Sequence, residues 1–369
     1  MKVGIIGLAQ SGKTSLYNAL TRSKVELNKF GGTEISVGVI SVPDPRFTHA
    51  VTVCEPKKVS PATIEFTEGG ARIERGERPG SGSSDKFGAD FFSAVRNMDA
   101  LVLVTRAFES AEVVDPDGGI NPLLEVQKIS EELLFADLTV VESRLEKLEK
   151  ARLQKRQSNA EAAEHSVLDK IKAHLETEQP VRTLPLTEDE QRNIRSYAFV
   201  SGKPLMIAVN IGEDQIGDSL PTTLDPLAAY AAEHHTPLIA MCAKVEAEVA
   251  QMEPEEEREV LEAMGIAEAA RDRLIRAAYD ALGVMSFFTV GPDEVRAWTI
   301  PKGCNAVTAA GAIHSDLSRG FIRAEVIAFE DLKATGGCWD DAKAAGKMRL
   351  EGKEYLVKDG DILQIRFKV

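Results

Sequence analysis

Six short runs rich in apolar and β-branched residues recur along the first two thirds of the chain and predict the strands of a covered sheet. These runs are Lys2–Leu8, Val37–Val42, Thr63–Thr67, Ala100–Val104, Leu205–Asn210 and Pro237–Met241. Several are apolar throughout, which is typical of parallel strands buried on both faces. Helical patterns lie between them, notably Lys13–Thr21 and Asp85–Met98. This alternation predicts a doubly wound α/β domain.

The alternation is interrupted between about residues 122 and 200, where apolar residues recur at helical spacing with charges between them. Leucine and valine step by four and three residues from Leu134 to Leu148, and the pattern returns from Leu168 to Leu175 after a polar stretch. This favours an antiparallel coiled-coil hairpin inserted into the α/β domain. The alternative is a pair of ordinary amphipathic helices packed on the sheet.

After Gly283 the pattern changes to short strands separated by glycine and proline turns. The expected strands are Phe287–Val290, Val295–Thr299, Phe321–Ile327, Tyr355–Val357 and Ile362–Phe367, and Arg271–Leu282 is the expected helix that leads into them. We therefore expect three domains. Residues 1–123 and 200–283 form the α/β domain, residues 124–199 form the helical insertion, and residues 284–369 form a small α+β domain.

Composition narrows the class of protein. With 43% apolar and 28% charged residues the chain can bury a sizeable core, which excludes wholesale disorder. No apolar run approaches the roughly 20 residues that span a bilayer, and the N-terminus does not read as a secretory signal. The four cysteines lie far apart without a C-x-x-C pair, which argues against a disulfide framework and a cysteine zinc site. A cytoplasmic protein with no membrane contact is expected.

The chain carries 44 basic and 58 acidic residues, so its formal charge is −14. Such a surface does not attract nucleic acid as a whole. No DNA partner is expected, and any RNA contact must come from a local basic patch.

The segment Gly7–Thr14 matches the P-loop pattern G-x-x-x-x-G-K-[ST], and it follows a predicted strand and opens a predicted helix. Its glycines let backbone N–H groups surround phosphate oxygens, and the helix N-terminus adds partial positive charge. Lys13 is expected to reach the β- and γ-phosphates and the Thr14 hydroxyl to ligate Mg²⁺. The expected phosphate-binding residues are Gln10, Ser11, Gly12, Lys13, Thr14 and Ser15.

Two further residues are candidates for contacts near the metal. Thr33, in the segment Gly31-Gly32-Thr33, could close over Mg²⁺ and the γ-phosphate as a switch threonine, although a plain turn residue is the alternative. Glu68 follows the predicted strand Thr63–Thr67, where a Walker-B-like carboxylate is expected. Glu68 and Lys13 are thus the candidate catalytic residues, and a solvated strand-end carboxylate is the alternative for Glu68.

The run Asn210-Ile211-Gly212-Glu213 stands where guanine-specific P-loop proteins carry N-K-x-D. Ile211 replaces the lysine, and Glu213 replaces the aspartate with a side chain longer by one methylene. Because adenine has an acceptor at N1, a carboxylate held for guanine repels it, and moving that carboxylate away removes the discrimination against ATP. Cys242 and Ala243 follow the next strand, where a backbone N–H could complete the base pocket. ATP is therefore expected, with GTP as the alternative.

The chain resembles the Obg-like ATPases, the YchF family of TRAFAC-class P-loop proteins, along nearly its whole length. The resemblance rests on Gly7–Thr14, Pro43-Asp44-Pro45-Arg46, Ala136-Asp137-Leu138, Asn210-x-x-Glu213, Phe288–Gly291, Glu294–Pro301, Ala309–Asp316, Gly320–Glu325 and Val357–Asp361. The motifs after residue 284 look like the ubiquitin-like TGS domain of that family. The resemblance implies a protein that prefers ATP to GTP, hydrolyses it slowly with Mg²⁺ and associates with ribosomes.

The chain departs from the family pattern at switch II. The family carries Asp-x-x-Gly, whereas this chain has Glu68-Gly69-Gly70-Ala71, followed by a longer loop of different character, Arg72–Lys86. A family histidine proposed to assist hydrolysis aligns near Asp115. Slow turnover is therefore expected. Two alternatives stay open: a GTPase, and a nucleotide-gated binding module without significant hydrolysis.

Basic residues gather near the C-terminus of this acidic chain. They are Arg319, Arg323, Lys343, Lys347, Arg349, Lys353, Lys358, Arg366 and Lys368. If they share a face with the base of the coiled coil, they form a basic cleft for ribosomal RNA. An ordinary surface of mixed charge is the alternative.

Overall fold

The computed structural model describes residues 1–23, 35–68, 73–75, 85–111, 113, 119–154, 158–217, 220–337 and 339–368. The chain divides into two compact units. Unit 1 contains Met1–Gly38 and Glu65–Leu274, and unit 2 contains Val39–Ile64 and Ile275–Val369. The chain therefore leaves unit 1 early, enters unit 2, returns, and enters unit 2 again near its C-terminus.

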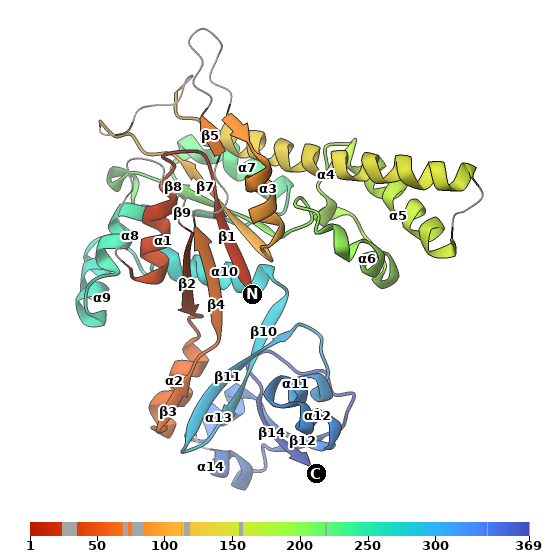
Figure 1. Ribbon diagram of the computed structural model, residues 1–369. Helices are drawn as coiled ribbons and strands as arrows, with labels where there is room; N and C mark the ends of the chain where they lie inside the picture. The colour runs from red at the N-terminus through yellow and green to blue at the C-terminus, as the bar shows by residue number, and fades with distance from the viewer. Residues whose placement is uncertain are drawn as a thin grey trace. The chain divides into compact units, whose positions relative to one another are not determined.

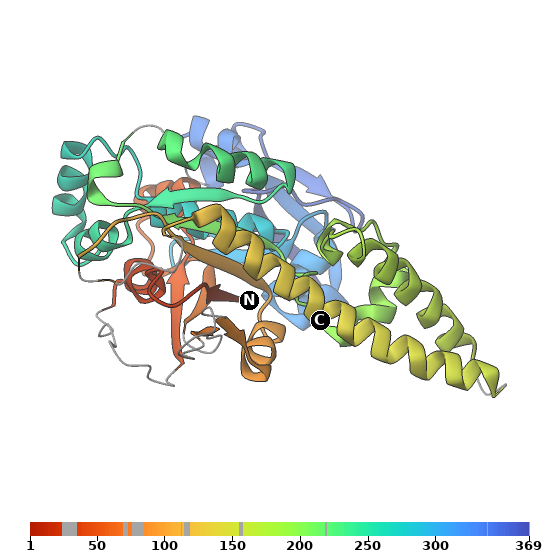
Figure 2. The same cartoon turned by 90° about the horizontal axis from the view of Figure 1, so that it is seen from above.

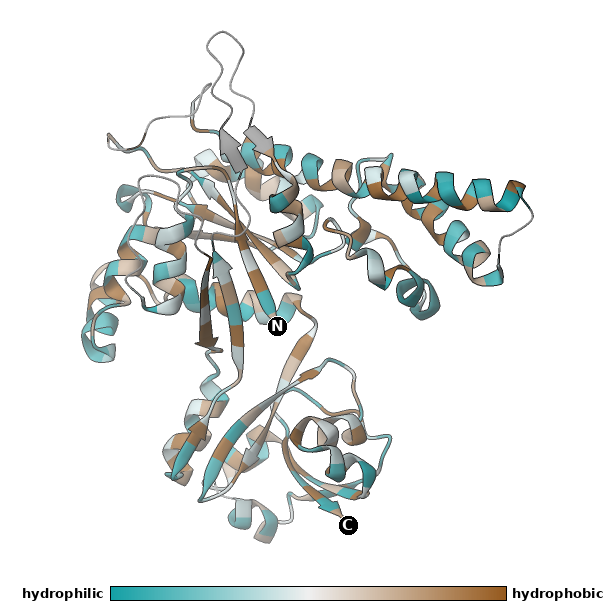
Figure 3. Ribbon diagram, in the orientation of Figure 1, coloured by the Kyte–Doolittle hydropathy of each residue, from teal (hydrophilic) through white to brown (hydrophobic). Residues whose placement is uncertain are grey.

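Unit 1 is built on a six-stranded sheet with the strand order β2-β4-β1-β7-β8-β9 (Figure 1). The strands are β1 (Lys2–Ile6), β2 (Ser36–Ser41), β4 (Thr63–Glu68), β7 (Ala100–Arg106), β8 (Leu205–Asn210) and β9 (Leu238–Met241). From β4 to β9, neighbouring strands pair in parallel. All residues of β7 and β8 are buried, and Figure 3 shows the hydrophobic colouring of these central strands. Their continuous apolar runs follow from this burial on both faces.

Helices follow most of these strands. The helices that begin in unit 1 are α1 (Lys13–Thr21), α3 (Ala89–Arg96), α4 (Pro122–Leu153), α5 (Asn159–Leu175), α6 (Glu188–Ile194), α7 (Asp225–Glu233), α8 (Ala243–Val249), α9 (Pro254–Ala263) and α10 (Ala270–Ala281). The expected P-loop α/β class is thus present in this unit. In the described part of the chain, no helix has both the length and the apolar character that crossing a membrane requires.

The helix expected over Asp85–Met98 is partly wrong. Residues Asp85–Phe87 form strand β6, which pairs antiparallel with β5 (Ile73–Arg75), and the helix begins only at Ala89. Gly88 precedes α3 with extended backbone angles, so the helix cannot continue through it toward the N-terminus. The pairing with β5 is a non-local contact, and helical periodicity carries no information about it.

Helices α4 and α5 form an antiparallel hairpin, which Figure 2 shows from above. The first half of α4 packs into the core of the sheet through Val126 and Ile129. The second half packs instead into a separate apolar core with α5, which includes Val141 and Leu168. The sheet therefore covers only one half of α4. This arrangement favours the inserted hairpin over two helices packed wholly on the sheet, and its coiled-coil geometry stays a prediction.

A buried carboxylate fixes the end of this insertion. Asp137 on α4 is 1% exposed and accepts hydrogen bonds from the backbone N–H groups of Val200 at 2.9 Å and Ser201 at 2.7 Å. Burial raises the pKa of this carboxyl group. Because buried N–H groups need acceptors, Asp137 holds the chain that returns from the hairpin toward β8.

Unit 2 contains a second six-stranded sheet with the order β13-β12-β14-β10-β11-β3. Its strands are β3 (Lys58–Ser60), β10 (Val284–Val290), β11 (Glu294–Pro301), β12 (Phe321–Ile327), β13 (Arg349–Glu351) and β14 (Ile362–Phe367). Its helices are α2 (Pro45–Cys54), α11 (Ala306–Ile313), α12 (Ser315–Arg319), α13 (Phe329–Ala334) and α14 (Trp339–Ala344). Ala306 and Ala309 of α11 pack against Phe287 and Val326 of the sheet.

Two expectations for this region are corrected. Tyr355–Val357 is not a strand, because Leu356 makes only an isolated bridge with Asn305, and the additional strand is Arg349–Glu351 instead. Residues 39–64 were expected in the α/β domain but belong to unit 2, where β3 pairs in parallel with β11. The division into three domains otherwise stays a prediction.

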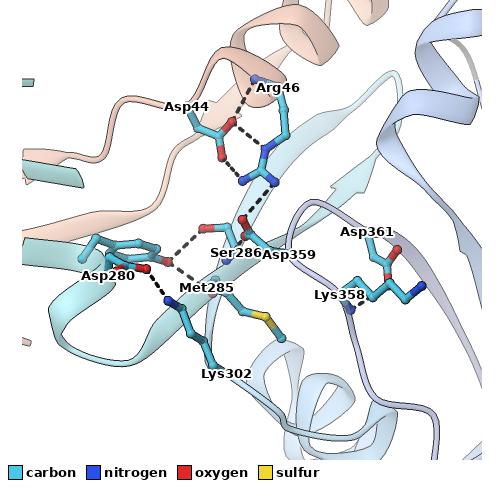
Figure 4. A network of polar contacts seen from close by, with 10 residues as sticks. Asp44, Arg46, Asp280, Met285, Ser286, Lys302, Lys358, Asp359 and Asp361 are labelled. Carbon is cyan, nitrogen blue, oxygen red and sulfur yellow. Dashed lines mark hydrogen bonds and ion pairs between the residues drawn. The ribbon is translucent and has the colours of Figure 1, made fainter. Parts of the chain in front are cut away.

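Two of the sequence motifs meet in unit 2 (Figure 4). The Arg46 guanidinium donates to the Asp44 carboxylate at 3.0 and 2.8 Å and forms an ion pair with Asp359 at 3.0 Å. Gly360 has φ +84°, and a Cβ atom there would lie 2.6 Å from Nη1 of Arg46. The motifs around Arg46 and Asp359 therefore fasten α2 to the turn before β14.

Candidate nucleotide-binding site

The P-loop segment connects β1 to α1 at the carboxyl edge of the unit 1 sheet. Gly7 and Gly12 have φ values of +151° and +98°, which side chains rarely adopt. A Cβ atom on Gly7 would lie 2.3 Å from the carbonyl oxygen of Val104, and one on Gly12 would lie 2.1 Å from Nδ2 of Asn210. Both glycines are therefore required by the close approach of neighbouring strands.

The loop fits a phosphate group. Helix α1 begins after Gly12, which has no side chain to cap it, and the start of a helix is a favourable place for an anion. Within the described residues, the buried hydroxyl of Ser11 has no hydrogen-bond partner. The Lys13 ammonium donates to the carbonyl oxygen of Leu8 at 2.7 Å, which places it over the loop. Within the described residues, an unpartnered Ser11 hydroxyl, the Lys13 cation and a helix N-terminus together favour an anion.

Glu68 and Thr14 lie side by side. The Thr14 hydroxyl donates to Oε1 of Glu68 at 3.4 Å. Glu68 ends β4 and is 8% exposed, so it is not a solvated strand-end carboxylate. Burial, followed by the charge of Glu68, raises the pKa of Tyr17 on the next turn of α1. Hydroxyl and carboxylate oxygens are ligands that Mg²⁺ accepts.

The predicted switch elements are not part of this geometry. Thr33, the residues Gly69–Ala71 that follow Glu68, and Asp115 lie outside the described residues. Their proposed roles stay predictions.

Asn210 connects the P-loop to the loop after β9. The residue is buried, its Nδ2 donates to the carbonyl oxygen of Ser11 at 3.1 Å, and its Oδ1 accepts from the backbone N–H of Ala243 at 3.0 Å. Both polar ends of the side chain are therefore used to hold two loops together. A contact between Asn210 and a base stays a prediction.

The other expected base-pocket residues are divided between core and surface. Ile211 and Cys242 pack in the apolar core, and burial raises the pKa of the Cys242 thiol. Glu213 is more than half exposed and forms an ion pair with Lys244 at 2.7 Å. Gln10 and Ser15 lie in and after the loop as expected, with Gln10 at φ +64°.

The sequence patterns missed two residues that meet at the carboxyl end of β7, the neighbour of β1 in the sheet. Arg106 ends β7 and is 3% exposed, and its Nε donates to the carbonyl oxygen of Phe108 at 3.0 Å. The Glu125 carboxylate, in the first turn of α4, accepts from the Thr105 hydroxyl at 2.7 Å and from the backbone N–H of Arg106 at 3.2 Å. In the sequence, the signal that could have pointed to this site is a cation at the end of the apolar run Ala100–Arg106.

A parallel sheet with a glycine-bounded phosphate loop between its strand β1 and the following helix defines a P-loop nucleotide-binding protein. Comparison with known proteins narrows this class. The chain is 40% identical over 372 residues to "Ribosome-binding ATPase YchF" of Bacillus subtilis (strain 168), with 100% of both chains covered. It is 36% identical over 370 residues to the protein of that name from Escherichia coli O157:H7, covering 100% of this chain and 99% of the relative.

A plant relative and a solved structure point to the same family as these bacterial proteins. The chain is 34% identical over 373 residues to "Obg-like ATPase 1" of Oryza sativa subsp. japonica, covering 100% of this chain and 92% of the relative. The structure of the Schizosaccharomyces pombe YchF GTPase matches with a TM-score of 0.83 at 30% identity, covering 99% of this chain and 97% of that chain. The family model YchF-GTPase_C, "Protein of unknown function (DUF933)", matches residues 284–368. The chain belongs to the YchF/Obg-like ATPase family, which confirms the resemblance.

Replacing Asn210 with alanine tests its role as a link between loops. The Asn210→Ala variant leaves the carbonyl of Ser11 and the N–H of Ala243 without their partner, so the free energy of unfolding should fall by about 2–3 kcal/mol. Urea denaturation measures this loss. Asn193→Ala, at an exposed position on α6, is the matched control and should change stability by less than about 0.5 kcal/mol. Equal stability of the two variants would contradict the assignment.

Proposed function

We propose that this protein is a slow ATPase that works as a nucleotide-dependent switch on the ribosome. The observation that carries the proposal is the P-loop, in which a buried unpartnered Ser11 hydroxyl, the Lys13 ammonium and the uncapped start of α1 come together. The full-length relatives named ribosome-binding ATPases support it. The rivals are a GTPase and a binding module without turnover.

The preference for ATP rests on the Asn210–Glu213 segment. A guanine site needs a carboxylate held for the N1–H and N2 donors of the base. Here the Glu213 carboxylate forms an ion pair with Lys244, and Ile211 supplies no cation. The carboxylate that would reject adenine is therefore paired with Lys244, and ATP is the proposed nucleotide.

Thr14 and Glu68 are the residues that would hold Mg²⁺, because their oxygens already lie within reach of each other. A bound Mg²⁺ supplies charge neutralisation on the phosphates. Lys13 binds the phosphates, and Asn210 holds the P-loop through its hydrogen bond to the carbonyl oxygen of Ser11. The run Glu68–Ala71 contains no glutamine to orient water and lacks the closing glycine of the family pattern. Turnover should therefore lie well below the roughly 10 s⁻¹ typical of enzymes.

Ribosome binding through the C-terminal basic residues is the finer part of the proposal. Several of these cations have acidic partners within unit 2: Arg319 pairs with Asp316 at 3.5 Å, Lys347 with Asp331 at 3.0 Å, and Arg366 with Glu325. Such pairs reduce the local positive charge that RNA would meet. We therefore propose an RNA contact through unit 2 and the helical hairpin. The names of the relatives support this contact more than the surface charge does.

Titration of the protein with ATP and GTP by calorimetry, with Mg²⁺ present, tests the site and its preference. ATP should bind more tightly than GTP. Lys13→Ala should weaken either nucleotide by more than about tenfold, because a charge-assisted bond to phosphate is lost. Lys170→Ala, on the exposed side of α5, is the control and should bind like the parent. A GTP affinity tenfold above that of ATP would overturn the base assignment, and retained affinity in Lys13→Ala would overturn the P-loop assignment.

Glu68→Gln tests the metal role. The substitution keeps the shape of the side chain but removes its charge, so half-maximal ATP turnover should need about tenfold more Mg²⁺. Glu65→Gln, on the same strand and paired with Lys2, is the matched control and should leave the Mg²⁺ dependence unchanged. Steady-state phosphate release at varied Mg²⁺ measures both. If the Mg²⁺ dependence of Glu68→Gln equals that of Glu65→Gln, Glu68 has only a structural role.

Co-sedimentation with ribosomes across a salt series tests the partner. Binding should be strongest at low salt and should decline as salt rises, because contacts with RNA phosphates release counterions. The protein centrifuged without ribosomes is the control. Absence of co-sedimentation even at low salt would contradict ribosome binding and leave the nucleotide site untouched.

A further inference from the structure

A cavity of about 680 Å³ lies in unit 1 at the edge of the sheet opposite to the P-loop. It is lined by Met98 and Asp99 just before β7, by residues 202–204 just before β8, and by the chain that returns from the hairpin. Because the strands are parallel, these residues lie at their amino ends, whereas the P-loop and Asn210 lie at the carboxyl ends. The six residues of β8 span about 20 Å between the two edges. The cavity is therefore separate from the nucleotide site.

Cations outnumber carboxylates around this cavity. It is lined by Arg182, Arg192, Arg195 and Lys203, against Asp99 and Glu188. The Asp99 carboxylate accepts a hydrogen bond from the backbone N–H of Lys2 at 2.8 Å, and Arg192 pairs with Asp189 at 3.1 Å. Leu184 and Leu186 add apolar wall. A cavity of this size with apolar walls and a few convergent polar groups is typical of small-molecule sites.

Arg182 is the unusual residue of this lining. It is half-buried, and its Nη1 donates to the carbonyl oxygen of Ser201 at 3.3 Å. Burial lowers the pKa of its guanidinium to about 10, so the side chain is still a cation at neutral pH. Among the described residues no carboxylate forms an ion pair with it, although a guanidinium carries five donors.

A cation in this position is unfavourable for the isolated chain. Partial removal of a charge from water is unfavourable unless an opposite charge compensates it. An apolar side chain of similar length would avoid that cost and would extend the wall formed by Leu184 and Leu186. The chain therefore gains no evident stability from Arg182, and an anion from outside would supply the missing partner.

Lys203 provides a second cation in the lining of the same cavity. Its ammonium donates to the carbonyl oxygens of Arg96 at 3.0 Å and of Met98, and burial lowers its pKa. The positive charge is thus held by carbonyl dipoles at the end of α3. Two fixed cations beside an apolar wall match a dianion that carries a hydrophobic body.

We propose that this cavity is a second binding site, which takes a small phosphate-bearing molecule with its phosphate on Arg182 and Lys203 and its apolar body against Leu184 and Leu186. The site lies where the returning chain is bound to α4 through Asp137, because Ser201 contacts both Arg182 and Asp137. A ligand there would add a further connection between the hairpin and the sheet.

Phenyl phosphate is the probe, because it joins a phosphate to a small apolar body. Calorimetric titration uses the full-length Lys13→Ala variant, so that the P-loop does not contribute. We expect saturable one-to-one binding that is at least threefold tighter than that of inorganic phosphate or phenol. Arg182→Met in this background should weaken phenyl phosphate at least tenfold. Arg152→Met, at an exposed position of the hairpin outside the cavity, is the matched control and should change binding less than twofold.

Urea denaturation of Arg182→Met without ligand separates a binding role from a structural one. A cation kept for a ligand predicts a midpoint equal to or above that of the parent, whereas a structural role predicts a clear fall. Should Arg182→Met fail to fold, Leu186→Trp narrows the cavity from its other wall and should weaken phenyl phosphate at least tenfold. No saturable binding of phenyl phosphate, full binding of it by Arg182→Met, or a clear fall in the urea midpoint of Arg182→Met would each overturn the proposal.

Discussion

The nucleotide end of this protein depends on the side-chain amide of Asn210. One end of that amide holds the carbonyl of Ser11 in the P-loop, and the other holds the N–H of Ala243 at the start of α8. The close packing of Asn210 leaves no room for a Cβ atom on Gly12, and the left-handed backbone there opens α1 without a cap. One buried side chain therefore connects the phosphate loop to the start of α8 and leaves only a glycine room at position 12.

Two arginines of unit 1, one buried and one half-buried, show how differently the fold treats a charge. Arg271 on α10 is 2% exposed and contacts the carboxylates of Glu246 at 3.8 Å and of Glu257. Burial lowers the pKa of Arg271 and raises that of Glu246, yet each has an opposite charge beside it. Arg182 instead donates a hydrogen bond to the carbonyl oxygen of Ser201. Among the described residues, Arg271 therefore has carboxylates beside it within the packing of helices, whereas no ion pair with a carboxylate is formed by Arg182.

Much of this architecture was predictable because its signals are local. The P-loop is a contiguous motif, and the buried runs such as Leu205–Asn210 become parallel strands because both faces of the sheet are covered. The heptad-like spacing before Leu148 predicts the hairpin. In the structure, the second half of α4 packs on α5 and not on the sheet. The position of Glu68 at the end of β4 also followed from the sequence, but its burial against Thr14 did not.

The sequence by itself determined the class of protein, the phosphate loop and the positions of the main strands along the chain, because short-range periodicity and glycine spacing encode them. Only the tertiary structure decided the contacts between distant segments. Asp137 bonds a backbone 63 residues away, and β3 joins a strand more than 200 residues further along the chain. The cavity around Arg182 collects residues from two distant segments, 98–99 and 181–204. Such contacts arise when elements pack, and a side chain's burial depends on neighbours that no local pattern can name.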